Sequence, residues 1–100
     1  MRITFQPKEN IQQAMRRCGY FFIRQEGDEL SFARPMSSSG SGYPRFHIYV
    51  KVDDVSRETI INLHLDQKKP VYEGVTAHSG EYDGAMITNE IVRLKKILGL

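Results

Sequence analysis

Two stretches decide the fold of this chain: FHIYVKV at residues 46–52 and IINLHLD at residues 60–66. Apolar and polar residues alternate in both, and successive side chains of a β-strand point to opposite faces of a sheet. The pattern therefore predicts two half-buried strands that pair as an antiparallel hairpin. The polar row of this hairpin gathers five side chains in one small patch: His47, Tyr49, Asn62, His64 and Asp66.

The rest of the chain predicts two helices and a second hairpin. Apolar residues recur at helical spacing within residues 7–18 and again within residues 87–98. Segments 20–24 and 30–34 alternate in the manner of strands and flank a turn that contains a glycine. The pattern also allows a short strand at residues 2–5.

These elements predict a single α+β domain over residues 1–100, in the order helix, four antiparallel strands, helix. A Ser/Gly-rich segment at residues 36–43 is flexible by composition. Each helix has one apolar stripe, so both are expected on one face of the sheet. The residues expected to face them are Phe21, Ile23, Leu30, Phe32, Phe46, Ile48, Val50, Leu63 and Leu65. The opposite, open face is expected to carry Tyr20, Phe22 and Arg24 beside the histidine patch.

The composition is that of an ordinary globular protein, with 40% hydrophobic and 26% charged residues. A net charge of +2 permits contact with nucleic acid without requiring it. No apolar run approaches the roughly 20 residues of a membrane span, and the N-terminus lacks the apolar core of a secretory signal. The single cysteine, Cys18, excludes an internal disulfide and is expected to be a buried, inert thiol. We therefore expect a cytoplasmic protein without membrane contact.

The first third of the chain resembles the HicA toxin family over roughly residues 11–35. The resemblance rests on a helix that ends in GY at residues 19–20, on RQEG at 24–27 and on FARP at 32–35. HicA proteins are small RNA-cleaving toxins with a fold like that of double-stranded-RNA-binding domains. The resemblance therefore implies that fold and an RNA partner for this chain.

One departure from the HicA pattern affects its chemistry. In that family a serine and then the catalytic histidine follow the turn glycine, whereas this chain has Asp28 and Glu29 there. A carboxylate does not replace an imidazole as a base near neutral pH, so RNA cleavage of the family type is not expected. Segments 62–70 and 77–82 resemble small uncharacterised proteins of uncultivated bacteria with reduced genomes, a resemblance that implies no function.

Three functions remain open on these residues. The first is binding of RNA or single-stranded nucleic acid by the open face. Aromatic side chains would stack on bases and basic side chains would neutralise phosphates. The expected contact residues are Tyr20, Phe22, Arg24, Tyr49 and Lys51.

The second is a metal-binding or hydrolytic site. Imidazole and carboxylate groups are ligands for zinc, manganese or iron, and the candidates are His47, His64, Asp66, His78 and Glu81. Without a metal, a histidine held by Asp66 would act as a general base on Ser79 or Tyr49. The third function is a protein-interaction module or homodimer that uses the open face or a sheet edge.

Overall fold

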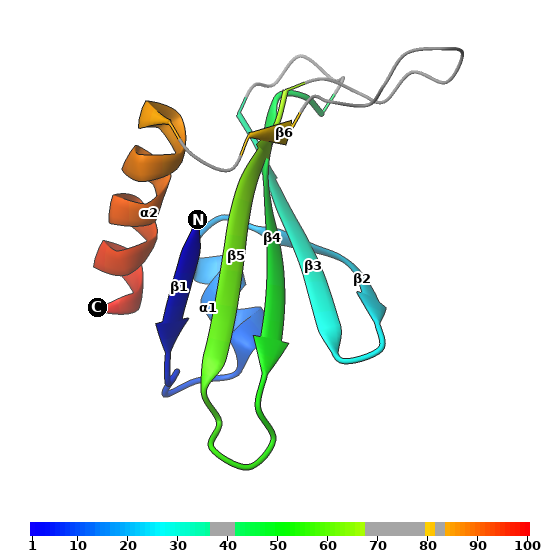
Figure 1. The fold of residues 1–100 in the computed structure, drawn as a ribbon, viewed down its shortest axis with the longest axis vertical. Coiled ribbons are helices and arrows are strands. Elements are labelled where there is room, and N and C mark those ends of the chain that lie inside the picture. Colours follow the sequence, from blue (N-terminus) through cyan, green and yellow to red (C-terminus); the bar gives the residue numbers. More distant parts are fainter. Residues whose placement is uncertain (37–41, 68–79, 82–83) are drawn as a thin grey trace.

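The two alternating stretches form the central pair of strands in an antiparallel sheet. In β4 (Arg45–Val52) and β5 (Thr59–Asp66), His47 lies opposite His64 and Ile48 lies opposite Leu63. The computed structural model describes residues 1–36, 42–67, 80–81 and 84–100. These residues form a small α+β domain with two helices (Figure 1).

The other strands extend the sheet on both sides of this pair, in the order β1-β5-β4-β3-β2. The two-residue strand β6 pairs with the end of β5. β1 and β6 thus add to the four strands of the two expected hairpins. The bounds of these elements are β1 (Arg2–Phe5), β2 (Phe21–Glu26), β3 (Glu29–Pro35), β6 (Gly80–Glu81), α1 (Ile11–Arg17) and α2 (Ala85–Leu98).

Local signals in the sequence set where the first helix begins and ends. The side chain of Asn10 accepts a hydrogen bond from the backbone N–H of Gln12 at 2.8 Å and so caps α1. The helix therefore begins after Asn10, later than the expected start at Pro7. It ends before Gly19, whose φ of 88° is a left-handed conformation that glycine adopts without strain.

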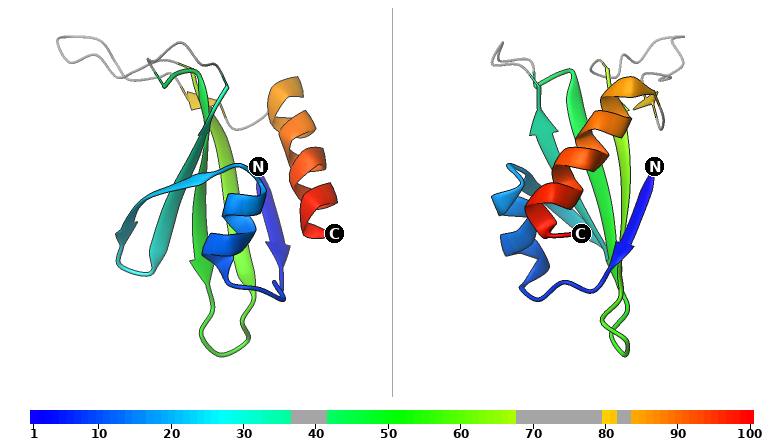
Figure 2. Two further views of the ribbon diagram at one scale, coloured as in Figure 1. Left: turned by 180° about the vertical axis from the view of Figure 1, so that it is seen from behind. Right: turned by 90° about the vertical axis from the view of Figure 1, so that its left-hand side faces the viewer.

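The apolar side chains of both helices and of one sheet face form a single core. α1 contributes Ala14, Met15 and Cys18 to this core. Burial also raises the pKa of the Cys18 thiol, as expected for an inert group. Both helices lie on that one side, and neither covers the opposite face of the sheet, the one expected to be open (Figures 1 and 2). The other members of the core are Ile3, Phe5, Tyr20, Phe32, Phe46, Ile48, Val50, Ile61, Leu63, Leu65, Ile87, Ile91 and Leu94.

A β-bulge at Ile23 exchanges the expected faces of the neighbouring phenylalanines. Phe22 lies opposite Phe32 but Arg24 lies opposite Ser31, so Ile23 is an extra residue in β2. Phe22 therefore faces the helix side, where its ring meets Phe32 edge to face with centroids 5.6 Å apart. Phe21, expected in the core, lies on the open face and is half exposed. Arg24 lies on the open face, as expected.

Tyr20 was expected on the open face but lies in the core, only 3% exposed. Its hydroxyl donates a hydrogen bond of 2.6 Å to the buried carboxylate of Glu90 on α2. Arg34 and Arg93 also donate to this carboxylate. Burial alone would raise the pKa of Glu90, but hydrogen bonds from Arg93, Arg34 and Tyr20 outweigh it and hold the pKa below its usual range. Glu90 thus joins α2 to the strands as a carboxylate.

We predict that Glu90→Gln destabilises the fold by about 3 kcal/mol, because it leaves two guanidinium groups without a partner charge in a partly buried site. The free energy of unfolding in urea measures the effect. Glu26→Gln is the matched control, since Glu26 pairs with Arg24 at an exposed site and should cost below about 1 kcal/mol. Equal losses in the two variants would contradict a structural role for Glu90.

Candidate functional site

Three neighbouring strands place a polar cluster on the open face of the sheet. β3 contributes Ser31, β4 contributes His47, and β5 contributes His64 and Asp66. The two histidines are direct cross-strand partners, and Asp66 follows His64 by two residues on the same face. Neither α1 nor α2 covers this face, yet His47, His64 and Ser31 are buried, with exposed fractions of 7%, 5% and 5%.

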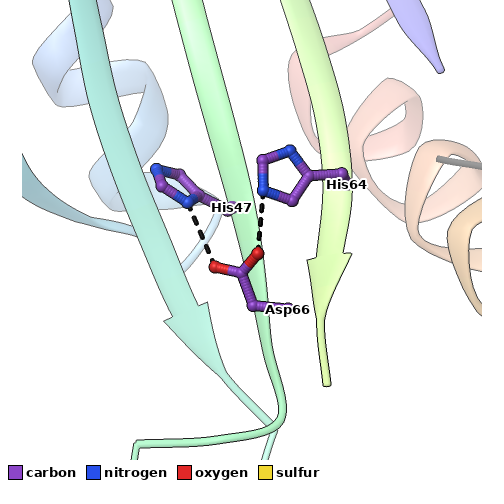
Figure 3. A group of neighbouring side chains, drawn as sticks. All are labelled: His47, His64 and Asp66. Atoms are coloured by element: carbon purple, nitrogen blue, oxygen red, sulfur yellow. Dashed lines mark hydrogen bonds and ion pairs between the residues drawn. The ribbon is translucent and has the colours of Figure 1, made fainter. Parts of the chain in front are cut away.

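The carboxylate of Asp66 lies between the two imidazole rings (Figure 3). Its Oδ2 is 3.2 Å from His47 Nδ1, and its Oδ1 is 2.9 Å from His64 Nε2. Arg45, directly opposite Asp66 in the sheet, donates from Nε to Oδ2 at 3.1 Å. One carboxylate thus accepts from three side chains.

The ionisation of Asp66 determines where the histidines carry hydrogen. Partial burial alone would raise its pKa, but hydrogen bonds from His47, His64 and Arg45 outweigh burial and hold the pKa well below its usual range. A carboxylate ionised near neutral pH only accepts hydrogen bonds. His47 therefore carries hydrogen on Nδ1, and His64 carries it on Nε2.

Ser31 completes the cluster, and sequence reasoning missed it. Its Oγ lies 2.5 Å from Nε2 of His47, the ring nitrogen that faces away from Asp66. A continuous chain of hydrogen bonds thus runs from Ser31 through His47 to Asp66. The signal that could have found it is the alternation of Leu30, Ser31 and Phe32, which puts the serine on the face opposite the two apolar residues.

A shallow depression on the surface reaches Ser31. Arg24, Glu26, Glu29, Ser31 and Tyr49 line it. Arg24 and Tyr49 are the cross-strand neighbours of Ser31 on its two sides. The ring of Tyr49 also stacks on His47 with centroids 4.4 Å apart. A guanidinium and a phenol hydroxyl thus belong to the same row of the sheet as the serine.

The structure brings together some of the sequence-predicted residues and not others. His47, His64 and Asp66 meet in one cluster, in which one ligand atom of each lies within 4.8 Å of the others. Tyr49, Asn62 and Lys51 lie on the same face by register. Tyr20 and Phe22 lie elsewhere, as described above. His78, Ser79 and the side chain of Glu81 fall outside the described residues.

The positions that correspond to serine and histidine in HicA proteins lie where β2 turns into β3. Asp28 is exposed in the turn, and Glu29 begins β3 and lines the depression beside Ser31. No protein-family model, curated protein or solved structure matches this chain. Within the described part of the chain, neither helix is long and apolar enough to cross a membrane.

We predict that Asp66→Asn lowers the free energy of unfolding at pH 7 by about 2 kcal/mol, through the loss of charged hydrogen bonds. The pKa of Asp66 is lower in the folded chain than in the unfolded chain. Its contribution to stability is therefore present above the unfolded value of about 3.9 and is lost as the pH falls below it.

Urea unfolding between pH 7 and pH 3 should show a shallower loss of stability in Asp66→Asn than in the wild type. The control is Asp54→Asn, because Asp54 is exposed in the turn between β4 and β5. If the free energy of unfolding of Asp66→Asn falls with pH as steeply as that of the wild type, the carboxylate does not stabilise the fold.

Proposed function

We propose that this domain hydrolyses small esters, with Ser31 as the nucleophile, His47 as the general base and Asp66 as the group that holds His47. One observation carries the proposal. Ser31 Oγ is 2.5 Å from His47 Nε2, and His47 Nδ1 is 3.2 Å from Asp66 Oδ2. Serine–histidine–aspartate hydrolases have the same arrangement: the serine hydroxyl lies at Nε2 of the histidine, and the aspartate lies at Nδ1.

The protonation states fit the roles. Since Nδ1 of His47 carries the hydrogen that faces Asp66, a neutral ring has its lone pair on Nε2. That nitrogen accepts the hydroxyl proton as Ser31 Oγ bonds to the ester carbonyl carbon. His47 then passes the proton to the departing alcohol. Water releases the acid from Ser31 by the same route, and the hydroxyl regains its proton.

Two neighbours of Ser31 can donate hydrogen bonds to the charge that develops on the carbonyl oxygen. Backbone N–H groups in the middle of a sheet are engaged in strand pairing, so side chains must provide the stabilising donors. Arg24, which also pairs with Glu26, and Tyr49 line the depression on either side of Ser31 and supply a guanidinium and a phenol as donors. Ser31 is only 5% exposed, so a small acyl group such as acetyl suits the site best.

The test uses p-nitrophenyl acetate as substrate and a fluorophosphonate as a covalent probe of activated serine. We expect chelator-treated wild-type protein to be acylated and labelled on Ser31, as located by peptide mass spectrometry. Ser31→Ala and His47→Gln should each lose roughly 10³-fold in the rate.

Ser56→Ala is the matched control, because Ser56 is exposed in the turn between β4 and β5. It should react as the wild type does. Absence of label on Ser31, or an undiminished rate in Ser31→Ala, would overturn the proposal.

Nucleic-acid binding is a second candidate, favoured by the shared face of Arg24, Tyr49 and Lys51. Phe21 takes the place of Tyr20 and Phe22 as the further aromatic residue on that face. We expect Arg24→Glu to weaken binding of a short RNA several-fold and to flatten its dependence on salt, measured by fluorescence anisotropy. An unchanged affinity would remove this candidate, and Arg16→Glu on α1 is the charge-matched control.

A further inference from the structure

The proposed hydrolytic chain leaves His64 without a role. This histidine is 5% exposed and directs Nε2 at Asp66 Oδ1 from 2.9 Å. In serine hydrolases one hydrogen bond from the catalytic histidine to the aspartate is enough to hold its ring, and His47 already makes that bond to Asp66. A second buried imidazole on the same carboxylate therefore points to a further ligand.

The three side chains form a set of metal ligands. Nδ1 of His47, Nε2 of His64 and an oxygen of Asp66 converge from two adjacent strands (Figure 3). Two imidazoles and one carboxylate are a donor set that zinc accepts, with bonds of about 2.0–2.2 Å and a fourth position for water. The ligand atoms lie within 4.8 Å of one another, so rotation of the side chains would have to bring them closer together around one ion.

The groups around these residues are those that support metal ligands. A histidine bound to a metal through one nitrogen usually donates from the other, and Ser31 Oγ lies at that place for His47. Arg45 donates to Asp66 Oδ2 and leaves Oδ1 to coordinate. The guanidinium charge opposes a cation, which favours reversible binding over permanent occupancy.

We propose that a divalent transition-metal ion, for which zinc is the probe, binds His47, His64 and Asp66 and thereby switches off Ser31. Coordination through Nδ1 moves the hydrogen of His47 to Nε2, because a neutral imidazole carries only one. Nε2–H then donates to Ser31 Oγ and no longer accepts its proton. The proposed binding of the ion depends only on the geometry of His47, His64 and Asp66. The proposed loss of Ser31 reactivity depends in addition on the proposed hydrolysis.

The first experiment measures zinc binding by titration calorimetry on chelator-treated protein. We expect one ion per chain in the wild type and in Ser31→Ala, and an affinity at least roughly tenfold weaker in His64→Gln. Glu58→Gln, at an exposed turn position, is the control and should bind as the wild type does. Equal affinity in the wild type and His64→Gln would overturn the metal site.

The second experiment compares fluorophosphonate labelling of Ser31 with and without zinc. Zinc should slow the labelling of the wild type, and a chelator should restore its rate. In His64→Gln the labelling rates with and without zinc should be nearly equal. Zinc that binds at His64 without slowing the labelling would overturn the switch. Failure of labelling in chelated wild type would overturn the hydrolytic proposal alone, because binding to Ser31→Ala tests the ion separately.

Discussion

The register between β4 and β5 is the constraint on which the rest of the structure depends. It sets Ile48 against Leu63 on the helix side and His47 against His64 on the other. Side chains alternate with a period of two, so a slip of one residue in one strand would put its polar row against the helices. A slipped pairing would bury an imidazole without partners and expose apolar side chains. The hydrophobic core and the polar cluster therefore specify the same register.

The sequence predicted this part of the fold because the evidence for it is local. Alternation over residues 46–52 and 60–66 determines both strands and their faces, and the short turn between them makes them neighbours. The meeting of His47, His64 and Asp66 follows from that pairing alone. Ser31 lies on β3, whose offset against β4 depends on a connection without a regular pattern. The sequence therefore set the face of Ser31 but not its position beside His47.

The first hairpin shows where local pattern is insufficient. Tyr20, Phe21 and Phe22 are all aromatic, so alternation does not tell which of them faces the core. The bulge at Ile23 shifts which residues of the strand face the core. An isoleucine at this position does not predict a bulge. Tyr20 is placed by Glu90, which is 70 residues away in the chain. Tertiary hydrogen bonding thus decided what strand periodicity left ambiguous.

The bulge has a consequence for the behaviour of this protein at high concentration. β2 is an outer strand of the sheet, and the unpaired backbone of such a strand is a template on which other chains assemble. An irregular step in the middle of β2 interrupts that template, so an incoming strand can follow it in register for only part of its length. Phe21 and Phe22 also lie on opposite faces there, so they do not form one continuous apolar patch. The bulge at Ile23 therefore makes β2 a poorer template for edge-to-edge assembly than a regular strand would be.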